Sequence, residues 1–220
     1  MIRRTLTLLA LVPAMLHAQE KGGKLPDVSS TVKGTLALPV PLGNPLFADI
    51  TESVGLLDAV IQFPVWKGLS LGAGGRMSWF GIEERALAPL VTTGEVRRLA
   101  FYGKAAYERY IGPATFYELS GRAGLSSYAF DCPTCPDKPF NNLFHWGLGL
   151  GLYLHATDNL AFGLTVGYET DAHTFRSDDL GLESFPGRHE KVEARNFGAF
   201  VFGMGFSTRL RRAQDDARGW

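Results

Sequence analysis

Residues 144–155 read FHWGLGLGLYLH, and residues 160–169 read LAFGLTVGYE. In both runs every second residue is large and apolar, whereas the residues between them are small or polar. A period of two is produced by a β-strand and not by a helix. The segment Thr157-Asp158-Asn159 between the runs has the composition of a turn. The sequence therefore predicts a hairpin with one long aliphatic face and one glycine-rich face.

The same alternation recurs along the chain and predicts eight strands. Besides the two runs above, the expected strands are residues 30–40, 54–66, 69–81, 95–111, 114–130 and 195–210. The expected long connections are residues 39–53, 83–94, 131–142 and 176–190, and the expected tight turns are residues 67–68, 112–113 and 157–159. Long and short connections alternate, so all long loops would lie at one end and both termini at the other.

This arrangement favours a membrane barrel over the alternative, a soluble barrel or sandwich. Strands of about twelve or more residues exceed the usual length of about 5 to 6 in globular proteins. Short turns at one end and long loops at the other are typical of outer-membrane barrels. Much of the glycine, 26 residues in all, alternates with apolar residues, which relieves crowding inside a small barrel. We therefore predict an all-β fold, an eight-stranded antiparallel up-and-down transmembrane β-barrel with short periplasmic turns and long extracellular loops.

The N-terminus has the pattern of a secretory signal. Residues 1–4 read MIRR, residues 6–16 are an apolar run, and Ala18 precedes Gln19. This pattern predicts a signal peptide over residues 1–18; the alternative, a retained helical anchor, would need roughly 20 apolar residues. We expect residues 19–29 to be a periplasmic segment, residues 30–210 the barrel and residues 211–220 a periplasmic tail.

The charge balance excludes one class of partner. The chain has 22 basic and 22 acidic residues and 45% hydrophobic residues. A composition of this kind suits one compact unit and offers no electrostatic basis for binding nucleic acid.

The chain resembles the small bacterial outer-membrane barrels of the OmpA, OmpX and OmpW type, the outer membrane protein beta-barrel domain group. The residues that carry the resemblance are 34–39 (GTLALP) with 41–43 and 47–49 behind them, 158–162 (DNLAF) leading to 167–169 (GYE), and the alternating aromatics of the last strand. The resemblance implies a porin-like protein in the outer membrane of a Gram-negative-type cell, surrounded by lipid and lipopolysaccharide and inserted by the barrel assembly machinery.

The C-terminus departs from that family pattern. Such proteins usually end on an aromatic residue that closes the last strand and looks like the assembly signal, whereas here residues 211–219 separate the strand from Trp220. Either Trp220 is the signal, or residues 206–210 are the signal and the last ten residues are a tail. We favour the tail.

Charged side chains on the inward face form the main candidate site. The expected inward polar residues are Lys33, Asp58, Gln62, Arg76, Arg98, Lys104, Glu108, Glu118, Arg122, His145, His155, Glu169 and Arg209. Glu108 and Glu118 are equidistant from the turn at residues 112–113, as are Lys104 and Arg122, so this hairpin should bring two acids and two bases together.

An eight-stranded barrel is just wide enough for its interior side chains, and unpaired buried charges are very costly. We predict a lumen charge network that plugs the barrel, made of Arg76, Lys104, Glu108, Glu118, Arg122 and Glu169. The alternative is a narrow or gated passage for a small solute.

The two cysteines, Cys132 and Cys135, lie in the third long loop. An even pair in a secreted chain predicts a disulfide, and the alternatives are a redox pair or a metal site. A redox pair needs a helix N-terminus, and structural zinc needs four ligands, whereas His145, His173 and His189 are scattered. We expect no metal and no cofactor.

A membrane enzyme is a further alternative, since small outer-membrane barrels include lipid A deacylases and acyltransferases. Such activity needs a Ser or Asp with a His at the external rim, and His173 with Asp171 and Asp178 is the nearest approach. No serine lies at hairpin distance, so we expect no catalytic residue. The chain should act structurally, in adhesion or in surface binding through its four loops. Loop aromatics that suit an external partner, or an interfacial girdle, are Phe47, Phe140, Phe175 and Phe185.

Overall fold

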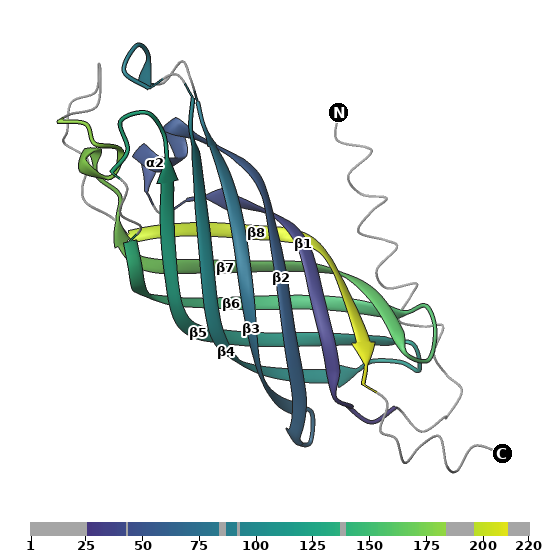
Figure 1. The fold of residues 1–220 in the computed structure, drawn as a ribbon. Coiled ribbons are helices and arrows are strands. Elements are labelled where there is room, and N and C mark those ends of the chain that lie inside the picture. The colour runs from purple at the N-terminus through teal and green to yellow at the C-terminus, as the bar shows by residue number, and fades with distance from the viewer. Residues whose placement is uncertain are drawn as a thin grey trace, which may run out of the picture.

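The computed structural model describes residues 26–42, 44–83, 87–91, 93–136, 140–183 and 196–210. These residues form a closed antiparallel barrel in which each strand pairs with the next and β1 pairs with β8 (Figure 1). The strands are β1 (Thr31–Pro41), β2 (Thr51–Trp66), β3 (Leu69–Ile82), β4 (Glu95–Tyr110), β5 (Thr115–Asp131), β6 (Phe140–His155), β7 (Leu160–Thr174) and β8 (Asn196–Arg209). The predicted eight-stranded up-and-down barrel is confirmed.

The outward face carries the apolar residues that the alternation predicted. In β6, Leu148 and Leu152 are 58% and 51% exposed, whereas Gly147 and Gly151 are buried. Every strand contributes large exposed apolar side chains, for example Leu36, Leu57, Leu71, Phe101, Leu119, Leu150, Leu164 and Met204. A contiguous apolar surface of this extent is not left exposed to water in soluble proteins. These outward side chains therefore indicate contact with lipid.

The tight turns lie together at one end of the barrel. Lys67 and Gly68 join β2 to β3 with φ of 26° and 87°, and a Cβ at Gly68 would lie 2.6 Å from the carbonyl oxygen of Glu108. Both the left-handed backbone and this close approach require glycine at position 68. We call this end the turn end and the opposite end the loop end.

Two expected long loops are partly ordered into short helices. Helix α2 (Pro45–Ile50) lies within residues 39–53, and the 3-10 helix η1 (Ser177–Leu180) lies within residues 176–190. The Asn44 side chain caps α2 by accepting hydrogen bonds from the backbone N–H groups of Leu46 and Phe47 at 3.0 and 3.2 Å. Among the described residues no helix is long and apolar enough to cross a membrane.

Several predicted loop boundaries were wrong by one to three residues. Strand β2 begins at Thr51 and β6 at Phe140, so the strands extend into the segments expected as loops. Register with the neighbouring strand decides where pairing ends, and the backbone of Phe140 still faces Tyr128 in β5. The expected signal peptide, most of the segment 19–29 and the C-terminal tail lie outside the described residues.

An apolar cluster closes the loop end of the lumen. Its buried members are Leu46, Phe47, Ile50, Phe80, Ile82, Leu87, Val91, Val96, Tyr128, Phe175, Leu180, Leu182, Phe197 and Ala199. Phe47 of α2 lies at its centre, with edge-to-face contacts to Phe80, Phe175 and Phe197 at centroid distances of 5.2, 5.2 and 5.0 Å. We call this cluster the apolar cap, and it brings α2 and η1 over the mouth of the barrel.

A smaller cluster narrows the turn end. It consists of Tyr110, Phe116, Tyr153 and Ala161, with Val28 packed against it, and we call it the aromatic floor. The Phe116 and Tyr153 rings stack at 5.0 Å. The Tyr110 hydroxyl lies 2.9 Å from His155 Nε2 and accepts a hydrogen bond from Arg209 at 2.8 Å. The lumen between cap and floor is therefore enclosed at both ends by packed side chains.

Candidate functional site

The lumen between the apolar cap and the aromatic floor holds ten charged side chains. The cationic ones are Lys33, Arg76, Arg98, Lys104 and Arg122, and the anionic ones are Asp58, Glu108, Glu118, Glu169 and Asp171; none is more than 11% exposed. Five positive and five negative charges balance among the described lumen residues. Buried charges are tolerated only when they are paired and hydrogen-bonded, and ion pairs join all ten.

The lower ion cluster lies next to the aromatic floor. Lys33 Nζ donates to both Glu108 and Glu118, and Lys104 Nζ donates to Glu118 Oε1 at 2.6 Å. The amide of Gln62 also donates to Glu108. Glu108 and Glu118 face each other in the β4–β5 register, as their distance from the turn predicted. Since β1 and β5 are on opposite walls of the barrel, Lys33 links those walls across the lumen.

The middle ion cluster is centred on Asp58. Its carboxylate accepts from Arg76 Nε at 2.8 Å, from Arg122 Nη1 at 3.0 Å and from the Tyr102 hydroxyl. Arg76 also pairs with Glu169, which lies on β7 across the lumen from β3. A second cross-lumen contact therefore lies above the first.

The upper ion cluster is centred on the fully buried Arg98. Its guanidinium pairs with Glu169 Oε1 at 3.0 Å and with both carboxylate oxygens of Asp171. Asp171 also contacts His145 Nδ1 at 2.8 Å and accepts a hydrogen bond from the Tyr128 hydroxyl. Because Tyr128 belongs to the apolar cap, this cluster adjoins the cap directly.

The structure places all six residues of the predicted network in the lumen but divides them between clusters. Lys104, Glu108 and Glu118 are in the lower cluster, where Lys33 joins them. Arg76 and Arg122 instead share Asp58, and Glu169 bridges Arg76 and Arg98. Lys33, Asp58 and Arg98 were expected to face inward, but nothing in the sequence indicated which charges they would meet.

The predicted position of Asp171, beside His173 at the external rim, was wrong. The period of two continues through β7 from Glu169, so Asp171 faces the lumen and is fully buried. His173 Nε2 lies 3.0 Å from Asp179 Oδ2 instead. Extending the alternation by two residues would have found this lumen acid.

A cavity of about 40 Å³ lies between the lower and middle clusters. The charged side chains that line it are Lys33, Asp58, Arg76, Lys104, Glu118 and Arg122. Uncharged residues of β1, β2, β4, β5, β6, β7 and β8 complete it, among them Tyr102, Ser120 and Gly149. A buried water needs about 10 to 15 Å³, so the cavity has room for about three. We call it the lumen cavity.

No protein-family model and no curated protein sequence matches the chain. Among solved structures, Neisserial surface protein A superposes with a TM-score of 0.50 and 12% identity, over 82% of this chain and 97% of that one. This chain has the fold of the small outer-membrane β-barrels. Two others superpose at lower scores. OprG from Pseudomonas aeruginosa superposes with a TM-score of 0.48 and 10% identity, over 86% of this chain and 99% of that one. Ail of Yersinia pestis superposes with a TM-score of 0.43 and 11% identity, over 81% of this chain and 97% of that one.

The likeness to small outer-membrane barrels that the sequence indicated is thus confirmed at the level of the fold. A likeness at 12% identity shows the fold and assigns neither a ligand nor a role to any residue of this chain. The residues that could give this barrel a function of its own lie in its lumen and its loops.

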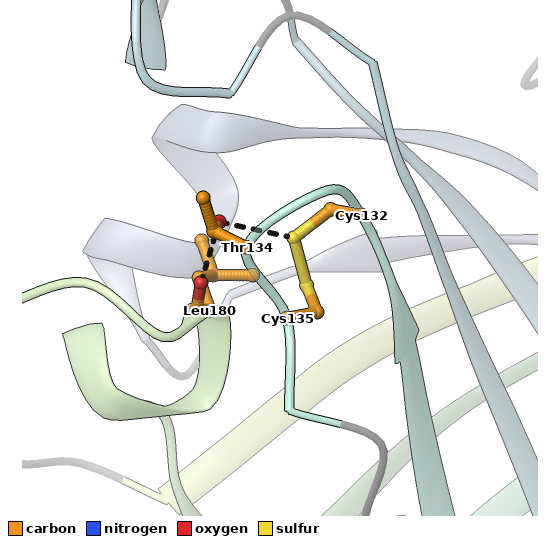
Figure 2. The surroundings of a disulfide bond; sticks show 4 residues. All are labelled: Cys132, Thr134, Cys135 and Leu180. Atoms are coloured by element: carbon orange, nitrogen blue, oxygen red, sulfur yellow. Dashed lines mark hydrogen bonds between the residues drawn. A yellow bond between two sulfur atoms is a disulfide. The ribbon is translucent and has the colours of Figure 1, made fainter.

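The loop end of the barrel carries a disulfide between Cys132 and Cys135 (Figure 2). Both cysteines pack against the apolar cap. Between them in sequence, Thr134 Oγ1 donates a hydrogen bond to the carbonyl oxygen of Leu180 in η1 at 2.8 Å. Gly181, with φ of 68°, allows this approach, since a Cβ there would lie 2.0 Å from the Thr134 carbonyl oxygen. The disulfide loop is therefore docked on η1.

Replacing both cysteines by serine should lower the free energy of unfolding by about 2 kcal/mol, the chain-entropy value for so short a closed loop. The measurement is urea unfolding of the lipid-reconstituted protein. Wild type in reducing agent should behave like the double variant, and Thr134→Val, which keeps the disulfide, isolates the contact to Leu180. Equal stability of the double variant and wild type would show that the loop needs no covalent link.

Proposed function

We propose that this chain is an outer-membrane protein with a closed lumen, which acts as an envelope scaffold and surface-binding protein through its loop end. The observation that carries the proposal is the series of packed side-chain layers that cross the lumen. The apolar cap, three ion clusters and the aromatic floor follow one another from the loop end to the turn end.

Each layer opposes passage for a different reason. An ion would have to leave water to pass the apolar cap, which is unfavourable. A polar solute would have to separate cross-lumen ion pairs such as Lys33–Glu118 and Arg76–Glu169, leaving buried charges unpaired. The lumen cavity, at about 40 Å³, is a small space between these pairs. These features support a plug over the alternative, a narrow channel.

The loop end has features suited to surface binding. Helix α2 and η1 contribute buried side chains to the apolar cap, and the disulfide loop is docked on η1. Recognition elements held in place before binding lose less conformational entropy when a partner binds. This favours adhesion or capture of an external ligand at the loop end.

The proposal orients the barrel with its turn end in the periplasm and its outer rim among lipopolysaccharide. Residues 1–18 would direct export, and the barrel assembly machinery would insert the strands, with residues 211–220 left as a periplasmic tail. An enzymatic role is not part of the proposal, because Asp171, one acid of the suspected rim group, is buried in the lumen with Arg98.

Reconstituted into planar bilayers, the protein should show no unitary conductance in neutral-pH salt, since the filled lumen offers no continuous water path. Heat-modifiable migration on a detergent gel must first show that the sample is folded, and an open porin in the same bilayers provides the positive control. Reproducible current steps from folded protein would overturn the plug and favour the small channel. Identical migration of heated and unheated samples would contradict the membrane barrel.

A further inference from the structure

The lumen cavity has a local excess of positive charge. Four cationic side chains line it against two anionic ones, Asp58 and Glu118, although the ten lumen charges balance as a set. Two of the four cations each pair with two carboxylates. Lys33 lies between two glutamates, and Arg76 between Asp58 and Glu169. Lys104 and Arg122 each pair with one carboxylate only.

Lys104 and Arg122 face each other directly in the β4–β5 register. Like charges at opposed positions of a sheet repel. Each shares its single carboxylate with another cation: Lys104 pairs with Glu118, which also pairs with Lys33, and Arg122 pairs with Asp58, which also pairs with Arg76. Lys104 and Arg122 are therefore the least compensated of the four cations that line the cavity, although the charges of each cluster balance in number.

The same two side chains have unused hydrogen-bond donors. Lys104 Nζ makes one hydrogen bond within the described part of the chain, to Glu118, although an ammonium carries three N–H groups. Arg122 donates through Nη1 to Asp58, while its buried Nε has no partner there. Nε–H and one N–H of Nη2 point the same way along one edge of the guanidinium, as in bidentate binding.

Neighbouring groups hold that guanidinium edge in place. The Arg122 guanidinium carbon lies 5.3 Å from the centroid of the Tyr102 ring. A Cβ at Gly149 would lie 3.2 Å from Arg122 Nη2 and 3.0 Å from Ser120 Oγ, so glycine at this position leaves room beside both groups. Gly149 and Ser120 both line the lumen cavity.

We propose that the lumen cavity binds one halide-sized monovalent anion, chloride in the cell, between Lys104 Nζ and the Nε–Nη2 edge of Arg122. A monovalent anion accepts the unused N–H groups of these two opposed cations. A cavity with room for about three waters accommodates one such ion with water but excludes phosphate and larger organic anions. The ion is thereby a structural part of the plug.

The test compares urea unfolding of the vesicle-reconstituted protein in sodium chloride and in sodium gluconate at equal ionic strength. For a dissociation constant of about 10 mM, about 100 mM chloride should raise the folding equilibrium constant about tenfold, because only the folded state has the site. Crystals grown in bromide should show an anomalous peak between Lys104 and Arg122. Equal stability in the two salts together with no bromide peak would overturn the proposal and leave a cavity that holds water alone.

Single-residue variants test whether the stabilisation by chloride comes from the lumen cavity. Lys104→Met should abolish the advantage of chloride over gluconate, whereas Arg98→Met, which lies outside the lumen cavity, should lower stability but keep that advantage. If Lys104→Met does not fold, Gly149→Ala serves instead, since its methyl group crowds Arg122 Nη2 and Ser120 and should remove the bromide peak. A chloride advantage that survives in Lys104→Met or Gly149→Ala would place the ion elsewhere and overturn the proposal.

Discussion

Replacing Lys33 by methionine should lower the free energy of unfolding by about 3 to 5 kcal/mol, the range expected when one partner of a buried ion pair is removed. Lys33 is 2% exposed, and its ammonium bonds both Glu108 and Glu118. Without it, two register-opposed carboxylates remain, with Lys104 and Gln62 as their partners. The lost ammonium also lies 5.4 and 5.3 Å from the centroids of the Phe116 and Tyr153 rings, so its contact with the aromatic floor is lost too.

The measurement is urea unfolding of the lipid-reconstituted protein, monitored by tryptophan fluorescence. The double variant Lys33→Met with Glu108→Gln removes one charge of each sign and should recover most of the loss. Lys67→Met, at an exposed turn position, controls for the general effect of losing a lysine and should change stability by less than about 0.5 kcal/mol. A loss below about 1 kcal/mol for Lys33→Met would mean that water replaces the cross-lumen contact.

Replacing Phe47 by alanine should cost about 3 to 5 kcal/mol, the usual range for a buried phenylalanine. Phe47 is 1% exposed, and its ring contacts three other phenylalanines of the apolar cap. The cost should fall on the loop end, because α2 loses its main anchor while the strand pairing is unchanged. We therefore expect α2 to detach before the barrel unfolds.

Limited proteolysis of intact vesicles measures that detachment directly. Cleavage near residues 45–50 should accelerate in Phe47→Ala, with heat-modifiable gel migration retained. Leu90→Ala is the matched control, since Leu90 is near the same end but 52% exposed, and its cleavage rate should equal that of wild type. Unchanged cleavage in Phe47→Ala would contradict the role of the apolar cap in holding α2.

The strands could be predicted because a strand's signal is local. Alternation needs only neighbouring residues, so Leu148, Leu150 and Leu152 were assigned outward from the chain alone. Register across a tight turn is nearly as local, which is why the opposition of Glu108 and Glu118 followed from their distances to the turn.

The apolar cap could not be predicted because its parts are short and far apart. Helix α2 has six residues, less than two helical turns, too few to show a helical period. Phe47 and Phe175 were noted only as loop aromatics. Their contact depends on two loops, 39–53 and 176–190, that meet over the mouth of the closed barrel.

The amino-acid pattern was sufficient for the number of strands, for the lipid and lumen faces, and for the charges that turn inward except Asp171. The partners of these charges were decided only when the barrel closed. The stagger of the strands determines which side chains lie at the same level on opposite walls of the lumen. Thus Lys33 meets Glu118, Arg98 meets Asp171, and Lys104 and Arg122 are left with unused donors beside a small cavity. Alternation along a strand is a property of the backbone, whereas pairing across a lumen is a property of the assembled barrel.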